Sequence, residues 1–289
     1  MKRFLNKNNF ICFLKTATGC GLLVYLFLHK RINFNFFTFE NIPLLVQLFI
    51  LQLVPFFIVT LRWHLIASRV YGMKMKFLTT LHISWAGQFF ENFIPSTIGT
   101  DASRIYYAGK VSNLSKGDLF KITVADRLSA LFAVTLCGIL GLIFYFFHLA
   151  PAISLLSAAA VLILIRFSMR GLLKPFLQKA AFRMPPFGAV ALSVVNFMLK
   201  ALSLFLVVYF TKGSAGREDY YLCLAYQCIE VITILPVNAG IGQVLFGRVS
   251  SFAGILNGAQ VYNIYFTVKI FFKATGFAGW LAIRRINKL

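Results

Sequence analysis

Long, nearly uninterrupted apolar runs constrain the fold of this chain more than any other feature of its sequence. Runs of about 20 apolar residues are long enough to cross a hydrocarbon core of roughly 30 Å as an α-helix. The chain is 59% hydrophobic and only 13% charged, so a water-soluble fold could not bury its apolar surface. The sequence therefore predicts an all-α polytopic membrane protein. The runs lie at residues 10–28, 42–61, 77–98, 125–147, 150–165, 188–210, 221–256 and 261–283.

The runs follow one another without a linker or a shift in composition, which predicts a single integral membrane domain over residues 1–289 and no soluble domain. The basic N-terminus and the apolar stretch after it resemble a signal peptide, but no small-residue cleavage site follows, so we interpret this stretch as a retained first span. The five cysteines lie inside apolar runs and lack the spacings typical of metal or redox sites. We interpret them as core residues, and we expect no metal and no cofactor.

The distribution of charge predicts how the runs are threaded. The net charge of +21 is concentrated in short connections, as expected for cytoplasmic loops under the positive-inside rule. If every run crossed, the basic connections 100–127 and 166–183 would lie outside. Both violations disappear if run 77–98 is a re-entrant hairpin that enters and leaves on the cytoplasmic side. The basic C-terminus then faces the cytoplasm only if run 221–256 does not cross either.

We therefore predict about six transmembrane helices and two opposed re-entrant hairpins, at about 77–98 and 221–256. Both termini and the two basic connections are expected to be cytoplasmic, and the near-neutral loop 211–220 is expected to be external.

Each predicted hairpin is interrupted by proline and glycine, which an uninterrupted transmembrane helix would hardly tolerate. The first reads Q-x-x-E and then P-x-x-x-G between Gln88 and Gly99, and the second repeats this pattern between Gln227 and Gly240. We interpret the likeness as an inverted repeat, an architecture that recurs in transporters. Broken backbone at membrane depth persists only where protein or a water-filled cavity satisfies its polar groups, so we expect a site there. The cavity residues predicted from this pattern are Gln88, Glu91, Pro95, Gln227, Glu230, Pro236, Asn238, Gly240 and Gly242.

Ionisable residues inside the apolar runs are a second indication of a site, because a charge within a bilayer is costly and usually marks function. Four lysines, Lys15 among them, lie inside predicted spans, and Arg248 lies in the second predicted hairpin. The predicted hairpins contribute only Glu91 and Glu230 as carboxylates. Structural pairing remains an alternative for any single lysine and glutamate, but it cannot neutralise all the cations. We therefore predict a surface that binds an anionic, phosphate-bearing lipid headgroup. Its predicted residues are Lys200, Lys269, Lys273 and Arg104.

Several short motifs occur in a distinctive order along the chain. They are Arg62-Trp63 at the end of a run, Asn92-Phe-Ile-Pro95, Gly99-Thr-Asp101-Ala-Ser-Arg104, Asp126-Arg127-Leu128, and Leu235-Pro236 through Gly240-Ile-Gly242. In order and spacing they resemble the lysylphosphatidylglycerol synthase transmembrane region, a family also called flippase-like. Two departures stand out, since this chain has Gly99-Thr100-Asp101 where the family commonly shows Gly-Gly-Asp, and Gln243 where the family commonly places Glu.

The resemblance implies a bacterial or archaeal plasma membrane and the movement of lipids or lipid-linked headgroups between leaflets. It carries over Arg104 and gives no charged role to Gln243. Members that make aminoacylated lipid have a soluble transferase domain after the membrane region, and only a few residues follow the last run here, so we expect no aminoacyl transfer from this chain. To the predicted cavity residues the resemblance adds Asn92, Asp101, Asp126 and Arg127.

Three classes of function remain open at this point. A translocase of an anionic lipid or lipid-linked headgroup best explains the opposed hairpins and the surplus of cations. A membrane-embedded transferase would need a general base and usually an acidic metal-binding motif at a membrane face, and the predicted external loops offer only Glu40 and the Glu218-Asp219 pair. The third class is a pore or an accessory subunit in the modification of envelope lipid or polysaccharide. The expected partners are anionic phospholipids or polyprenyl-phosphate-linked species and an enzyme of envelope biosynthesis, with no nucleic acid and no catalytic residue.

Overall fold

The structure is a computed structural model that describes residues 42–91, 98–147 and 185–232 and parts of 261–286. All secondary structure within these ranges is helical, as predicted. Three helices are long and apolar enough to cross a membrane, namely α2 (Ile42–Tyr71), α5 (Lys116–Phe147) and α8 (Phe187–Lys212). The runs 10–28 and 150–165 lie outside the described residues, so the number of six crossings stays a prediction.

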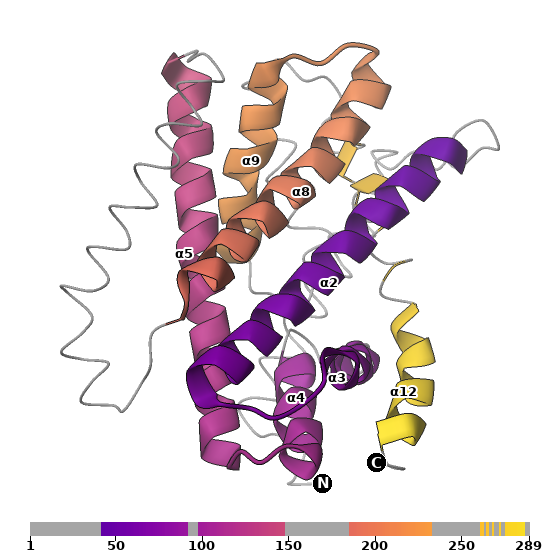
Figure 1. Cartoon of the computed structure of the whole chain (residues 1–289). Helices are drawn as coiled ribbons and strands as arrows, with labels where there is room; N and C mark the ends of the chain where they lie inside the picture. Colours follow the sequence, from indigo (N-terminus) through magenta and orange to yellow (C-terminus); the bar gives the residue numbers. More distant parts are fainter. Residues whose placement is uncertain are drawn as a thin grey trace, which may run out of the picture.

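The three long helices extend beyond the apolar runs that predict them. They contain 30, 32 and 26 residues, which at 1.5 Å per residue makes them about 39–48 Å long, against a hydrocarbon core of about 30 Å. Figure 1 shows α2 running toward the end of the molecule where the short helices α3, α4 and α12 lie, while α5 and α8 run away from it. We call this end the α3–α4 end and the opposite one the α8–α9 end.

Two short helices, α3 (Phe77–Glu91) and α4 (Ile98–Val111), follow α2 and precede α5 in the sequence. They pack against each other. With 15 and 14 residues, each is about 21–23 Å long, too short to cross a core of about 30 Å. The backbone N–H of Lys74, before α3, donates to Oδ1 of Asn113, after α4, at 3.0 Å. The α3–α4 pair therefore returns to the end of the molecule at which it starts.

This helical pair covers residues 77–111, whereas the apolar run places both limbs of the hairpin within 77–98. The difference arises because α4 carries Asp101, Arg104 and Lys110 and is much less apolar than α3. Hydropathy therefore assigns α4 to a polar connection. The break itself, with Asn92 and Pro95, lies outside the described residues.

Helix α9 (Arg217–Ile232) follows α8 after a short loop and packs on α5 and α8. The Q-x-x-E pattern ends at the last residue of α3, Glu91, and two residues before the end of α9, at Glu230. The two patterns thus occupy equivalent places at the ends of helices of 15 and 16 residues. Because residues 233–260 lie outside the described residues, the second hairpin and the inverted repeat stay predictions.

Local sequence signals set the helix ends near the α3–α4 end. Helix α2 stops at Gly72, whose φ of +68° is the left-handed conformation that commonly ends a helix. The N–H of Met73 then donates to the carbonyl of Ala67 at 3.0 Å. Helix α5 starts after Ser115, whose Oγ accepts the N–H of Asp118 at 3.1 Å, a typical N-cap. These two ends direct the chain into α3 and out of α4 on the same side.

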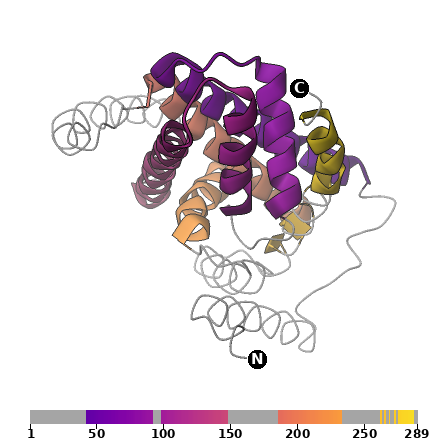
Figure 2. The ribbon, with the colours of Figure 1, turned by 90° about the horizontal axis from the view of Figure 1, so that it is seen from below.

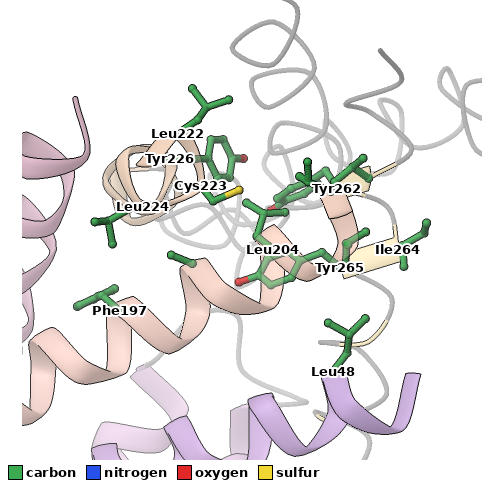
Figure 3. Packing of buried hydrophobic residues seen from close by; sticks show 14 of the residues in the cluster. Leu48, Phe197, Leu204, Leu222, Cys223, Leu224, Tyr226, Tyr262, Ile264 and Tyr265 are labelled. Atoms are coloured by element: carbon green, nitrogen blue, oxygen red, sulfur yellow. The ribbon is translucent and has the colours of Figure 1, made fainter. Parts of the chain in front are cut away.

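The described helices share two main buried cores. One lies between α2, α5, α8 and α9, and Figure 3 shows Leu204 of α8 beside Tyr226 of α9 and the later residues Tyr262 and Tyr265. The other joins α2, α3, α4 and α5 around Trp63. Large apolar side chains also point outward, including Val46, Ile50, Val54, Phe57 and Leu61 on α2. An outward apolar stripe of this length suits a helix that contacts lipid.

The described chain ends with the 3₁₀ helix η4 (Thr275–Ala278) and α12 (Gly279–Ile286). Run 261–283 is therefore not one continuous α-helix, because it tightens into 3₁₀ geometry at Thr275. Figure 2 shows α12 beside α3, which lies between α12 and α4. The basic residues at the end of run 261–283 thus belong to a helix packed at the α3–α4 end.

Candidate functional site

A buried ion pair joins the two longest described helices. Arg62 of α2 donates from Nε and Nη2 to the two carboxylate oxygens of Asp126 of α5, at 2.6 and 2.8 Å. The residues are 2% and 1% exposed. Nη1 of Arg62 also donates to Oγ of Ser193 on α8 at 2.9 Å. Because two parallel charge-assisted bonds fix both position and orientation, this pair holds α2, α5 and α8 in register.

A second buried arginine, Arg104 of α4, approaches the same carboxylate. Its Nη1 lies 4.0 Å from Oδ2 of Asp126, and its Nη2 donates to Oγ of Ser84 on α3 at 3.2 Å. The guanidinium lies over the ring of Trp63, 5.9 Å from its centroid. Nε of Arg104 is buried without a hydrogen-bond partner in the described part of the chain. A buried guanidinium normally has all its N–H groups hydrogen-bonded, so Arg104 is incompletely paired for a residue at this depth.

We call Arg62, Arg104, Asp126, Ser84 and Ser193 the inner cluster. Its two arginines share one carboxylate, so it contains one more positive group than negative groups. Buried charge is stable only when it is paired and hydrogen-bonded. The inner cluster therefore has the chemistry to accept one additional anionic oxygen at the Arg104 guanidinium.

A more exposed layer of charge flanks the inner cluster. Arg127 donates from Nε and Nη2 to the carboxylate of Asp101 at 2.9 and 2.7 Å, and these side chains are 40% and 20% exposed. Glu91 accepts a hydrogen bond from Oγ1 of Thr100 at 2.9 Å. With this layer included the charges balance, but Asp101 is engaged by Arg127. Among the described residues, Asp126 is the only carboxylate within 4.0 Å of Arg104.

Two glycines allow α3 and α4 to approach closely enough to build the cluster. A Cβ on Gly87 would lie 2.9 Å from both Oγ of Ser103 and Cγ2 of Thr100, and one on Gly99 would lie 2.9 Å from the carbonyl oxygen of Phe90. Real side chains essentially never show such short contacts, so a larger residue would push the helices apart. The close packing places Arg104 of α4 against Ser84 of α3.

The structure brings together several residues that the sequence predicts for the site. Arg104 and Asp126 lie in the inner cluster, and Asp101, Arg127 and Glu91 lie in the flanking layer. Gln88 is half-buried in the last turn of α3.

Other predicted residues lie elsewhere or outside the described residues. Gln227 is buried in α9, and its Nε2 has no hydrogen-bond partner in the described part of the chain. Lys200 is half-buried on α8, with its ammonium 5.3 Å from the ring centroid of Phe197. A common anion surface of the three lysines and Arg104 therefore stays a prediction. Outside the described residues are Asn92, Pro95, Pro236, Asn238, Gly240, Gly242, Lys269, Lys273 and the side chain of Glu230.

Three residues of the inner cluster, Arg62, Ser84 and Ser193, were not predicted as site residues from the sequence. Arg62 directly follows an apolar run, which made it look like the end of a span, but α2 continues to Tyr71. The available signal was the apolar periodicity after it, since Trp63, Ile66 and Ala67 are all fully buried. A helix whose buried face continues past an arginine places that arginine inside the protein. Within the described residues, no group of His, Cys, Asp and Glu is arranged to hold a metal ion.

Comparison with known protein families finds a match over most of the chain. The family described as Lysylphosphatidylglycerol synthase TM region matches residues 14–261, well over half of the chain. The matched range contains the whole inner cluster and every described helix except η4 and α12. No curated protein and no solved structure matches the chain.

Proposed function

The chain belongs to the lysylphosphatidylglycerol synthase transmembrane-region family, and from this membership and the inner cluster we propose that it is a translocase of an anionic lipid or lipid-linked headgroup. The observation that carries the proposal is the incomplete pairing of Arg104, whose Nε has no hydrogen-bond partner in the described part and whose Nη1 is 4.0 Å from Asp126. A headgroup phosphate fits this position, because guanidinium and phosphate form two parallel bonds.

The α3–α4 pair supports this role as a re-entrant element. Both helices are too short to cross, and the pair returns to its starting end through the contact between Lys74 and Asn113. In the proposed arrangement the pair enters the bilayer from this end and does not cross it. The buried Arg104 then lies at a depth where a lipid phosphate is its most available additional counter-ion.

The proposed orientation has the α3–α4 end in the cytoplasm. This end carries exposed basic side chains at Arg69, Lys74, Lys110 and Lys116. The loop at the α8–α9 end instead combines Lys212 and Arg217 with Glu218 and Asp219. The imbalance follows the positive-inside rule for a plasma-membrane protein.

The inner cluster suits transport because its two arginines are held differently. Arg62 is fixed by three hydrogen bonds to Asp126 and Ser193. Nη1 of Arg104 lies 4.0 Å from Oδ2 of Asp126, which is a weak ion pair. An arriving phosphate therefore has only this weak contact to displace. When the phosphate leaves, Asp126 remains to neutralise the guanidinium. A reversible exchange of anions at Arg104 is what a translocation site requires.

The test is lipid movement in proteoliposomes that contain phosphatidylglycerol with a fluorescent acyl chain, followed by quenching of the outer leaflet. Wild-type protein is expected to expose inner-leaflet lipid that protein-free vesicles retain. Arg104→Gln should lower the rate by roughly 10- to 150-fold, which corresponds to a lost hydrogen-bonding charge of about 1.5–3 kcal/mol. Arg69→Gln, on an exposed arginine of α2, is the matched control and should leave the rate unchanged.

Two results would overturn the proposal. If the folded wild-type protein leaves the leaflet distribution unchanged, an accessory role beside an envelope enzyme takes its place. If Arg104→Gln folds and moves lipid as fast as Arg69→Gln, Arg104 is a packing residue.

A further inference from the structure

A groove between α3 and α12 lies apart from the inner cluster. Its volume is about 280 Å³, slightly below the range of roughly 300–1,000 Å³ for pockets that enclose drug-sized ligands. It therefore suits part of one chain-like ligand better than a whole lipid. Its walls combine apolar side chains with two basic ones. The described lining residues are Leu81, His82 and Trp85 of α3 and Leu281, Ala282 and Arg285 of α12.

The walls of the groove are held in place by contacts behind them. Nε1 of Trp85 donates to the carbonyl oxygen of Thr275 at 3.2 Å, and its ring packs edge-on against Phe56 with centroids 5.6 Å apart. α12 docks through Gly279, where a Cβ would overlap the backbone of Trp85. These contacts make the groove a fixed feature of the packing of α12 against α3. Figure 2 shows these two helices side by side.

The outer face of α12 has the pattern of a membrane interface. Trp280 and Leu281 are 44% and 60% exposed. Arg284 lies four residues after Trp280, and Arg285 lies four residues after Leu281. The guanidinium of Arg284 stacks on Trp280, 3.7 Å from the ring centroid. Apolar and aromatic side chains one turn from exposed arginines place the apolar part in lipid and the charge at the headgroups.

We propose that this groove binds one acyl chain of an anionic phospholipid, whose phosphate pairs with Arg285. The apolar wall of Leu81, Trp85 and Leu281 accepts the chain, and the charge of Arg285 favours an anionic headgroup over a zwitterionic one. The groove shares no residue with the inner cluster. This lipid is therefore a resident boundary lipid that holds α12 against α3, and it is separate from any lipid that is moved.

The experiment uses Trp85 as a reporter inside the groove. The chain has three tryptophans, and Trp63 is fully buried, so the full-length Trp280→Phe variant leaves Trp85 as the accessible one. This variant is reconstituted with phosphatidylglycerol or phosphatidylcholine that carries brominated acyl chains, which quench indole fluorescence on contact. Phosphatidylglycerol is expected to reach half-maximal quenching at a lower mole fraction than phosphatidylcholine.

Adding Arg285→Gln should raise the mole fraction of brominated phosphatidylglycerol needed for half-maximal quenching by roughly fivefold, the factor for one basic residue at an anionic surface. Arg285→Lys keeps the charge and should keep the preference. Arg217→Gln removes an exposed arginine at the α8–α9 end and is the matched control. Equal quenching by the two lipids, or an unchanged preference in folded Arg285→Gln, would overturn the proposal. The readout is an equilibrium one and holds whether or not the protein moves lipid.

Discussion

The two ends of the described molecule hold their charged side chains in opposite ways. At the α3–α4 end, Arg62 and Asp126 form two hydrogen bonds of 2.6 and 2.8 Å in a fully buried position. At the α8–α9 end, Lys212 lies 3.4 Å from Asp219, and its side chain is 40% exposed. The buried pair joins residues 64 positions apart, whereas the exposed pair closes a loop across seven.

The comparison teaches that position in the fold, and not the number of charges, sets how much a charged pair contributes. Removing one partner of a buried pair costs about 3–5 kcal/mol, because the remaining charge has no water to solvate it. An exposed pair contributes only about 0.2–1 kcal/mol, since water competes for both groups. A polar cavity of about 390 Å³ lies against Lys212 and Asp219. Water in such a cavity can replace either partner.

The largest expected effect follows from removing the shared carboxylate. Asp126→Asn leaves both Arg62 and Arg104 without the carboxylate that they share, so we expect a loss of about 3–5 kcal/mol in the free energy of unfolding. Thermal unfolding of the detergent-purified protein measures this loss. Glu218→Gln removes a carboxylate at the α8–α9 end and serves as the control. Equal melting temperatures for the two variants would contradict the assignment of Asp126 as the centre of the network.

An intermediate effect is expected at Ser193. Ser193→Ala removes the acceptor of the Arg62 Nη1 hydrogen bond and leaves a buried donor unsatisfied, at a cost of about 1–3 kcal/mol. Ser203→Ala is the matched control, because Ser203 is equally buried on α8 and its hydroxyl donates to the carbonyl of Leu199 within the helix. The same unfolding measurement compares the two variants. If Ser203→Ala is the more damaging, the third bond of Arg62 is not a support of the inner cluster.

The smallest effect is expected at the α8–α9 end. Lys212→Gln removes the ion pair between the exposed ammonium of Lys212 and the buried carboxylate of Asp219. Because water solvates the ammonium, we expect a loss of at most about 1 kcal/mol. The loss should shrink as salt is raised, because exposed charges are screened. Asp219 still accepts the N–H of Gly216 at 2.9 Å, so the start of α9 keeps its cap. Melting temperatures of the wild type and of Lys212→Gln at low and high salt measure this loss of stability. A large loss that does not change with salt would contradict the contrast between the two ends.

Several elements of the fold and of the site can be predicted from the sequence, and there is a physical reason why these predictions succeed. The apolar runs predict α2, α5 and α8 because only helices satisfy their own backbone in lipid, and the structure has helices there. Arg104 and Asp126, which the family motifs indicate, lie together in the inner cluster. The polar helix α4 could not be found by hydropathy, since a helix that packs its charges against protein does not need an apolar surface.

The order and composition of residues in this chain are sufficient to predict the membrane class, the family and the basic character of one end. Each of these depends on local composition or on short motifs, which can be recognised without knowing the fold. The pairing of Arg62 with Asp126 and Ser193 is different, since it joins three helices that are distant in the chain. Close approach of α3 and α4 at Gly87 and Gly99 then decides that Arg104 reaches the same carboxylate. This packing decides which charges are neutralised and leaves Nε of Arg104 without a hydrogen-bond partner in the described part of the chain. The reason is that electrostatic interactions depend on distances in space and on the exclusion of water.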